Sequence, residues 1–265
     1  MHSIRSGQVR QPELLRIGPV TIECHVDGDG DPIVLLPSLG RGARDFEPLV
    51  PHLIGNGFRV LRPEPRGFGR SNGPAEGLSL QALAHDIAGV IDAKAGGRAI
   101  VLGHAFGNWV ARVTAVEHPN LVRGVVLAAA AAREQSPEVR AALAICHDDS
   151  KPREARLAAL QFAFFAPGHD PSVFLDGWSH AAIAIERQAT AASPRAAWWH
   201  GGSAPILDLQ AALDPFRPPS TRSENVDEFG SRVTVTVVAD ASHALIPEQP
   251  EAVAAAIADW SRTLP

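Results

Sequence analysis

The chain has 265 residues, of which 45% are hydrophobic and 20% charged, the composition of an ordinary globular protein. A net charge of −5 without any basic cluster gives no reason to expect a nucleic-acid partner. Two isolated cysteines exclude a disulfide framework, and no run of about 18 apolar residues is present to span a membrane. Because residues 1–11 are polar and lack the apolar core of a signal peptide, we expect a cytoplasmic protein.

Strand-like and helix-like segments alternate through the first half of the chain. The residues at 20–26 are typical of an antiparallel edge strand, and 32–36 is a short apolar run typical of a strand buried on both faces. Further strands are predicted at 59–61, 99–102 and 122–127, and helices at 46–54, 78–93 and 107–118. Strands that alternate with helices predict an α/β protein with a doubly wound, mostly parallel sheet.

This alternation stops after Ala132. Between Pro137 and about Trp199 the patterns are helical, and strand and helix resume at 206–210, 233–238 and 251–260. A helical insertion between two halves of a sheet predicts a lid, which gives a core domain of residues 1–132 and 201–265 and a lid of residues 133–200. The lid is rich in large apolar side chains, which we assign mainly to its own core and in part to a pocket wall: Phe162, Phe164, Phe165, Phe174, Trp178, Trp198 and Trp199.

The strongest chemical signal lies at residues 100–109, where a buried strand runs through a tight turn directly into a helix. Gly103 and Gly107 stand at the two glycine positions of a Gly-x-Ser-x-Gly nucleophile elbow, but Ala105 occupies the tip. Such a turn projects the central side chain from the sheet, and the N–H groups that follow it open a helix whose dipole favours negative charge. A Gly-x-Ala-x-Gly string alone is weak evidence for a nucleophile elbow, so the prediction depends on the other motifs of the chain.

Three other features follow in the right order. The strand and glycine-containing loop at 33–42 can supply an oxyanion-binding N–H from Leu39, beside the N–H of Phe106. The turn at 61–71 matches Pro-Asp-x-Arg-Gly-x-Gly-x-Ser with Glu64 in place of Asp, and we interpret it as structural. Asp214 and His243 each come after a predicted strand in the second half of the chain.

In these features the sequence resembles the α/β-hydrolase superfamily, in its branch of small lidded esterases, lactonases and enol-lactone or C–C hydrolases. The resemblance runs from about Val20 to Trp260 and implies an eight-stranded sheet. It also implies the chain order nucleophile, acid and histidine, here position 105, Asp214 and His243. Ala241 stands where the family's histidine loop has glycine, and Pro37-Ser38 stand where many relatives have His-Gly. Because the oxyanion donors are backbone N–H groups, the second departure leaves the proposed hole intact.

Several of these residues have a competing interpretation. Asp208 is the rival of Asp214 as the acid, but it falls inside a buried strand where a carboxylate would lack solvation. His104 and Trp178 are candidate substrate contacts, although packing beneath the turn is favoured for His104. Arg41 in the oxyanion loop is interpreted as a solvated arginine rather than as a ligand for an acidic substrate.

Ala105 leaves two alternatives open: an engineered replacement of serine, or a natural alanine. We favour the natural alanine because neighbouring residues also depart from the motif that is common in esterases. A methyl group cannot attack a carbonyl carbon, so covalent catalysis at this position is excluded for the chain as given. The leading hypothesis is a hydrolase of a small to mid-sized apolar ester, lactone or ketone, working through Ser, His243 and Asp214. If alanine is natural, His243 and Asp214 would instead activate water as a general base.

Two other classes of function stay open. One is a non-hydrolytic enzyme (a lyase, an isomerase or a cofactor-free oxygenase) that uses only His243 and Asp214. The other is a ligand-binding pseudoenzyme that keeps the pocket without the chemistry. A small-molecule substrate is the expected partner, a homodimer is possible, and we expect no cofactor because neither a phosphate-binding glycine loop nor a metal-ligand cluster is present.

Overall fold

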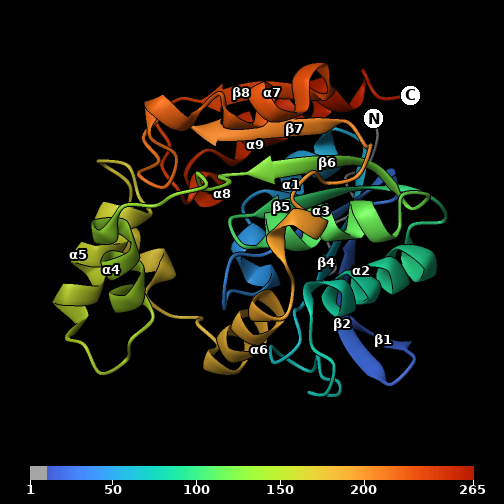
Figure 1. Cartoon of the computed structure of the whole chain (residues 1–265), viewed down its shortest axis with the longest axis horizontal. Helices are drawn as coiled ribbons and strands as arrows, with labels where there is room; N and C mark the ends of the chain where they lie inside the picture. Colours follow the sequence, from blue (N-terminus) through green and yellow to red (C-terminus); the bar gives the residue numbers. More distant parts are fainter. Residues whose placement is uncertain (1–10) are drawn as a thin grey trace, which may run out of the picture.

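The computed structural model describes residues 11–265, so the prediction about a signal peptide falls almost entirely outside the described part. Within it, eight strands form one sheet in the order β1-β2-β4-β3-β5-β6-β7-β8 (Figure 1). Strands β3 to β8 are parallel, whereas β1 and β2 pair antiparallel, which confirms the predicted doubly wound, mostly parallel eight-stranded sheet. The strands are β1 (Glu13–Ile17), β2 (Val20–Asp27), β3 (Asp31–Leu36), β4 (Phe58–Pro63), β5 (Ala99–His104), β6 (Val122–Ala128), β7 (Ile206–Ala211) and β8 (Val233–Val238).

The antiparallel edge of the sheet differs from the prediction. Strand β2 is antiparallel as expected, but it lies second in the sheet because β1 covers its outer side. The sequence of β1, Glu-Leu-Leu-Arg-Ile, buries only Leu15, so it has too little apolar alternation to be identified as a strand. Its place is set by pairing with β2, whose burial alternates along its length as a half-buried strand requires.

Helices cover both faces of the sheet. Helices α2 and α3 pack with the apolar side chains of one face, and α1 and α9 pack with those of the other. None of the helices in residues 11–265 combines the length and apolarity that a membrane crossing requires. The α-helices are α1 (Val50–Gly55), α2 (Leu80–Lys94), α3 (Gly107–Glu117), α4 (Pro137–Cys146), α5 (Arg153–Ala163), α6 (His180–Ala191), α7 (Glu224–Phe229), α8 (Leu245–Glu248) and α9 (Pro250–Ser261).

The helix predicted at 46–54 divides into two pieces. A short 3-10 helix η1 (Ala43–Phe46) comes first, and α1 begins only at Val50. Pro48 and Pro51 explain the break, because proline cannot donate an N–H and is tolerated only in the first turn of a helix. Pro51 occupies such a first-turn position in α1. Helix α7 was not predicted, and its short sequence carries only one fully buried residue, Asn225.

The segment between β6 and β7 contains α4, α5, α6 and short 3-10 helices, among them η2 (Pro171–Phe174) and η3 (Arg195–Ala197), and no strand. We call residues 133–200 the lid segment. Helices α4 and α5 stand away from the sheet in Figure 1 and share an apolar cluster that includes Phe164, Phe165 and Phe174 and extends to Phe216 and Ala244 outside the lid segment. Ser136 and Ser179 cap α4 and α6 by accepting hydrogen bonds from the N–H groups of Val139 and Ala182.

Candidate active site

The turn between β5 and α3 has the geometry of a nucleophile elbow. Strand β5 is buried along its whole length, and α3 begins at Gly107. Ala105 adopts a left-handed conformation with φ of +49°, which costs a residue with a Cβ of order 1 kcal/mol. Its N–H donates to the carbonyl of Ala128 at 3.0 Å, and its carbonyl accepts from the N–H of Asn108 at 3.1 Å. The strained elbow is therefore present although its tip carries only a methyl group.

The two elbow glycines are required by close backbone contacts. A Cβ at Gly103 would lie 2.2 Å from the backbone N of Asn108, and a Cβ at Gly107 would lie 2.3 Å from the carbonyl oxygen of Leu36. Distances this short cannot be relieved by side-chain movement because backbone atoms are involved. The Gly-x-Ala-x-Gly spacing is thus explained by the packing of α3 against β5 and the end of β3.

The two predicted oxyanion donors lie beside Ala105. Leu39 and Phe106 line the same cavity as Ala105, and within residues 11–265 neither backbone N–H donates a hydrogen bond. Gly40, the neighbour of Leu39, is held from the lid segment: its N–H donates to Glu186 Oε2 at 2.7 Å, and its carbonyl accepts from the N–H of Ser179 at 2.9 Å. Two unoccupied N–H groups near one point can stabilise a developing oxyanion.

The structure brings His243 and Asp214 together. His243 Nδ1 lies 3.0 Å from Asp214 Oδ2 and 3.2 Å from Oδ1, and both side chains are buried. A carboxylate that accepts from Nδ1–H leaves Nε2 as the basic nitrogen of the ring. Asp214 is held in turn, because its Oδ1 accepts from the backbone N–H of Phe216 at 2.8 Å. We call these two residues the His243–Asp214 pair.

Two aromatic rings that were not predicted as site residues enclose His243. Phe216 stacks on the imidazole with ring centroids 3.9 Å apart, and Phe164 meets it edge-on at 5.2 Å. The sequence could have indicated Phe216 as a site residue, because it comes only two residues after the predicted acid Asp214. Phe164 belonged to the aromatic run of the lid, where its pocket position could not be separated from a core position. The two rings fix the imidazole plane in front of Asp214.

Two further polar residues hold the loop that carries His243. Glu248 accepts from the N–H of Ser242 at 2.7 Å and from the N–H of Ala166 in the lid segment at 2.6 Å. His104 Nε2 lies 2.7 Å from the carbonyl oxygen of His243. Burial and the neighbouring His243 lower the pKa of His104 to about 3, so the ring is neutral at pH 7 and its Nε2–H donates to that carbonyl.

A cavity of about 360 Å³ lies over these groups, and we call it the active-site cavity. It does not include His104, which is 1% exposed beneath the turn, or Trp178. The structure therefore places both predicted substrate contacts outside the cavity lining. Its lining is mostly apolar and consists of Ser38, Leu39, Ala105, Phe106, Asn108, Trp109, Ala131, Gln135, Leu143, Phe164, Arg187, Thr190, Ala191, Phe216 and His243.

Arg41 is not the solvated loop arginine that the sequence suggested. It is 3% exposed and forms a two-pronged ion pair with Asp45, at 2.7 and 2.8 Å. Its guanidinium also lies over the rings of Phe174 and Trp178 and donates to the carbonyl of Asp176. Cation–π contacts with a desolvated arginine explain the burial. Arg41 and Trp178 thus join the oxyanion loop to the lid segment.

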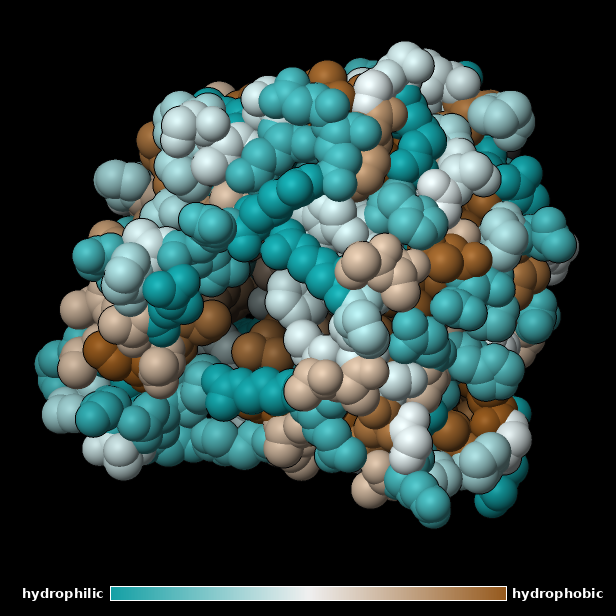
Figure 2. Space-filling model, viewed as in Figure 1, coloured by the Kyte–Doolittle hydropathy of each residue, from teal (hydrophilic) through white to brown (hydrophobic). Residues whose placement is uncertain are grey.

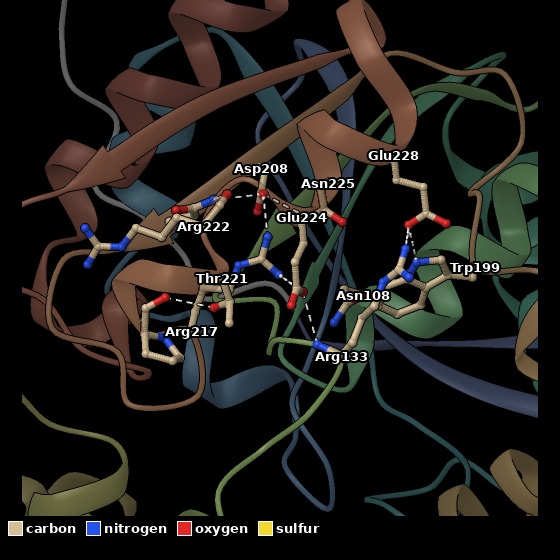
Figure 3. A network of polar contacts seen from close by, with 12 residues as sticks. Asn108, Arg133, Trp199, Asp208, Arg217, Thr221, Arg222, Glu224, Asn225 and Glu228 are labelled. Carbon is tan, nitrogen blue, oxygen red and sulfur yellow. Dashed lines mark hydrogen bonds and ion pairs between the residues drawn. The ribbon is translucent and has the colours of Figure 1, made fainter.

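Asp208, the rival acid, sits in a separate buried network (Figure 3). Its Oδ2 accepts from Gln210 Nε2 at 2.9 Å, from Asn225 Nδ2 at 2.8 Å and from Arg217 Nη2 at 3.3 Å. Asn225 continues the network to Arg112, which contacts Asn108 of the elbow at 3.3 Å. The partners of Asp208 are an arginine and two amides, whereas Asp214 faces His243 of the cavity wall, which supports the choice of Asp214 as the acid.

Within residues 11–265, no group of three or more His, Cys, Asp and Glu side chains is arranged to hold a metal ion. The two cysteines are buried far apart in the chain, and burial raises the pKa of both thiols to about 12. A thiol with such a pKa is not a nucleophile at neutral pH. Neither cysteine lines the active-site cavity, so neither replaces the missing hydroxyl.

Comparison with known proteins agrees with this geometry. A family model described as the alpha/beta hydrolase family matches residues 33–256. The chain is 32% identical over 143 residues to a putative carbamate hydrolase, RutD, of Variovorax paradoxus, covering 54% of this chain and 50% of the relative. It is 34% identical over 110 residues to the 2-(acetamidomethylene)succinate hydrolase of Mesorhizobium japonicum, covering 42% and 39%. The matched segments thus span half or less of these curated relatives.

A solved structure matches over a longer range. The enol-lactonase of Burkholderia xenovorans superposes with a TM-score of 0.76 at 24% identity, covering 94% of this chain and 100% of that chain. At this identity the likeness concerns the fold alone.

Proposed function

Since the chain belongs to the alpha/beta hydrolase family, we propose that it hydrolyses an ester or lactone bond of a small to mid-sized substrate with an apolar body. One observation carries this proposal: His243, held by Asp214, lines the same cavity as Ala105 of the elbow and two unoccupied N–H groups suited to an oxyanion. The names of the relatives, two hydrolases and a lactonase, support the same class of reaction. The expectations of a cytoplasmic location and of a homodimer stay predictions.

The proposed mechanism uses water as the nucleophile, because Ala105 cannot form an acyl intermediate. His243 Nε2 takes a proton from water while the water oxygen attacks the carbonyl carbon, and Asp214 stabilises the imidazolium that results. The N–H groups of Leu39 and Phe106 hold the tetrahedral oxyanion. The imidazolium then gives its proton to the departing alkoxide as the C–O bond breaks, which yields a carboxylic acid and an alcohol.

The absence of a hydroxyl at position 105 sets the expected rate. When one member of a triad is removed, the remaining groups keep about 10³–10⁴-fold catalysis over water. The missing side chain also leaves room for a water molecule between the elbow and the carbonyl carbon. We therefore expect slow but measurable hydrolysis by the chain as given and faster hydrolysis by Ala105→Ser, because the elbow already has the backbone conformation that a serine needs.

The experiment compares three proteins on a panel of aryl esters, alkyl esters and lactones: the chain as given, Ala105→Ser and His243→Ala. We expect Ala105→Ser to exceed the chain as given by at least about tenfold in kcat, and His243→Ala to lose activity. An acyl-enzyme should be detectable by mass spectrometry only in Ala105→Ser. Absence of turnover by both the chain as given and Ala105→Ser across the panel would contradict the proposal.

A second function is favoured by Ala105 itself. A histidine base facing a mostly apolar cavity without a side-chain nucleophile can remove a proton from a carbon acid, which is the first step of a lyase or isomerase reaction. This function predicts exchange of substrate C–H protons with D₂O that depends on His243 and is not improved by Ala105→Ser.

A ligand-binding pseudoenzyme would instead bind the same compounds with no product and with an affinity unaffected by His243→Ala.

A further inference from the structure

A second hollow adjoins the active-site cavity on the lid side. It has a volume of about 480 Å³ and shares Trp109, Ala131 and Gln135 with the cavity wall. Three arginines line it, Arg133, Arg140 and Arg195, and we call it the arginine groove. Figure 2 shows a hollow between the α4–α5 part of the lid segment and the core, with apolar surface inside and strongly hydrophilic side chains around its mouth.

Arg195 is the clearest unpaired cation of the groove. Its guanidinium lies over the Trp199 ring at 3.8 Å from the centroid, and within residues 11–265 it forms no ion pair or hydrogen bond. Burial and the charge of Arg133 lower the pKa of Arg195. A positive group that is partly desolvated and repelled by a like charge gains when an anion binds beside it.

Arg140 and Arg187 add to this positive charge. Arg140 donates to the carbonyl of Gln135 at 2.6 Å, and Gln135 belongs to both the groove and the cavity. Arg187 lines the active-site cavity itself, and its Nη2 lies 3.3 Å from His147 Nε2. Neither arginine forms an ion pair with a carboxylate within the described part of the chain.

The acidic side chains around the groove do not cancel this charge. Arg133 is neutralised by Glu228, which also accepts from the Trp199 indole at 2.8 Å. Glu224 is bound to Arg217 and to the backbone N–H of Arg133 (Figure 3). Glu134 is the remaining acid of the groove lining. Arg140, Arg187 and Arg195 thus form no ion pair within the described residues, and the nearby acidic charges are Glu134, Glu138 beside Arg140 and Glu224 beside Arg195.

From this arrangement we infer that the substrate carries a carboxylate remote from the scissile bond, with its apolar body in the active-site cavity and its acid group among Arg140, Arg187 and Arg195. The inference rests on the proposed function, because it names the substrate class of that same site. Arginine suits this task because its planar fork can hold a carboxylate through two hydrogen bonds. Trp109 and Trp199 supply an apolar wall for the chain that joins the two ends of the substrate.

The test is the binding of two probes that differ only at one end: monobenzyl glutarate, which has a free carboxylate, and benzyl methyl glutarate, in which that acid is esterified. Calorimetric titration and the fluorescence of the groove tryptophans report binding without requiring turnover. We expect the free acid to bind about tenfold more tightly in low salt, and this preference to shrink in about 0.5 M NaCl, since partly exposed ion pairs are screened.

The triple variant Arg140→Gln/Arg187→Gln/Arg195→Gln should bind the two probes equally, and Arg187→Gln alone should lose part of the preference. Arg153→Gln is the matched control, because Arg153 is an exposed lid arginine that lines neither hollow. Equal binding of both probes by the unchanged chain, or a preference that survives the triple variant, would overturn the inference. Selective binding of the free acid, together with absence of turnover across the ester and lactone panel, would refute the hydrolase proposal while leaving the carboxylate subsite standing.

Discussion

Asp208 and Asp214 lie close together along the chain, one inside β7 and one just after it, and both are almost completely buried. Their partners differ. Asp208 is surrounded by Arg217, Gln210 and Asn225, none of which exchanges protons near pH 7. Asp214 faces His243, whose imidazole can serve as a general base and lines the active-site cavity. Burial therefore does not distinguish the two aspartates. What distinguishes them is the partner of each carboxylate and whether that partner reaches the active-site cavity.

The position of each aspartate relative to β7 explains why the two side chains have different partners. At the middle of β7, Asp208 is flanked by β6 and β8, and its side chain is contacted by Gln210 of the same strand and by Arg217 and Asn225, which follow the strand. Asp214 lies past the carboxyl end of β7, the edge at which the loops after β5 and β8 also arrive. Functional groups of parallel α/β sheets gather at this edge.

The largest expected effect separates the two aspartates by activity. In the Ala105→Ser background, Asp214→Asn should lower kcat for ester hydrolysis by about 10³–10⁴-fold, because an amide cannot stabilise the imidazolium and favours the wrong tautomer of His243. The free energy of unfolding should change little by comparison. Steady-state kinetics on the best ester, together with urea denaturation, measures both quantities. If Asp214→Asn kept more than a tenth of the activity, Asp214 would not be the acid.

The second effect separates them by stability. Arg217→Met leaves Asp208 buried without its charged partner and should reduce the free energy of unfolding by about 3–5 kcal/mol. Because Arg217 and Asp208 lie outside the active-site cavity, kcat of the folded fraction should stay within a few-fold of the parent. The double variant Arg217→Met/Asp208→Leu is the control and should recover most of the lost stability. A loss of stability in the double variant as large as in the single one would show that the ion pair is not the cause.

Glu186 is a third buried carboxyl group, and it differs from the two aspartates in making the stability of the fold depend on pH. Burial raises its pKa from 4.5 to about 8, while the N–H of Gly40 opposes this rise only in part. In the unfolded chain the group ionises near 4.5, so the folded state holds the extra proton between these values. The contribution of Glu186 to the free energy of unfolding is therefore fully present below about pH 4.5 and is lost as pH rises through 8.

Glu186→Gln removes this dependence and keeps an oxygen that accepts from Gly40. We expect the variant to match the parent at pH 4 and to exceed its free energy of unfolding by roughly 2–4 kcal/mol at pH 9. Urea denaturation at several pH values gives both curves. Parallel curves for parent and variant would mean that Glu186 does not titrate in this range.

Much of the fold and the site geometry follows from local patterns in the sequence. The elbow is marked by Gly103 and Gly107, whose spacing is imposed by backbone contacts within the turn. His243 and Asp214 are marked by their places after strands, so the pair could be predicted without knowledge of its distance. The roles assigned to these residues stay proposals until the variants above are measured.

What the sequence could not supply depends on partners that are distant along the chain. Gly40 and Glu186 are separated by 146 positions, and neither residue has a pattern that points to the other. Arg41 was misjudged for the same reason, because its burial comes from Phe174 and Trp178 of the lid segment. Strand β1 escaped prediction because pairing with β2, and not apolar alternation, defines it.

The smallest expected effect concerns His104, which lies beneath the elbow and contacts the loop that carries His243. His104 is neutral at pH 7 and donates to the carbonyl of His243, so it positions the histidine loop. His104→Phe removes this bond and should cost about 1–3 kcal/mol of stability, because a buried carbonyl loses its partner. It should lower kcat several-fold without moving the acid limb of the pH–rate profile. His104→Gln, which keeps a donor, should recover part of both losses. A shift of the acid limb in His104→Phe would show that His104 itself takes part in the proton transfer.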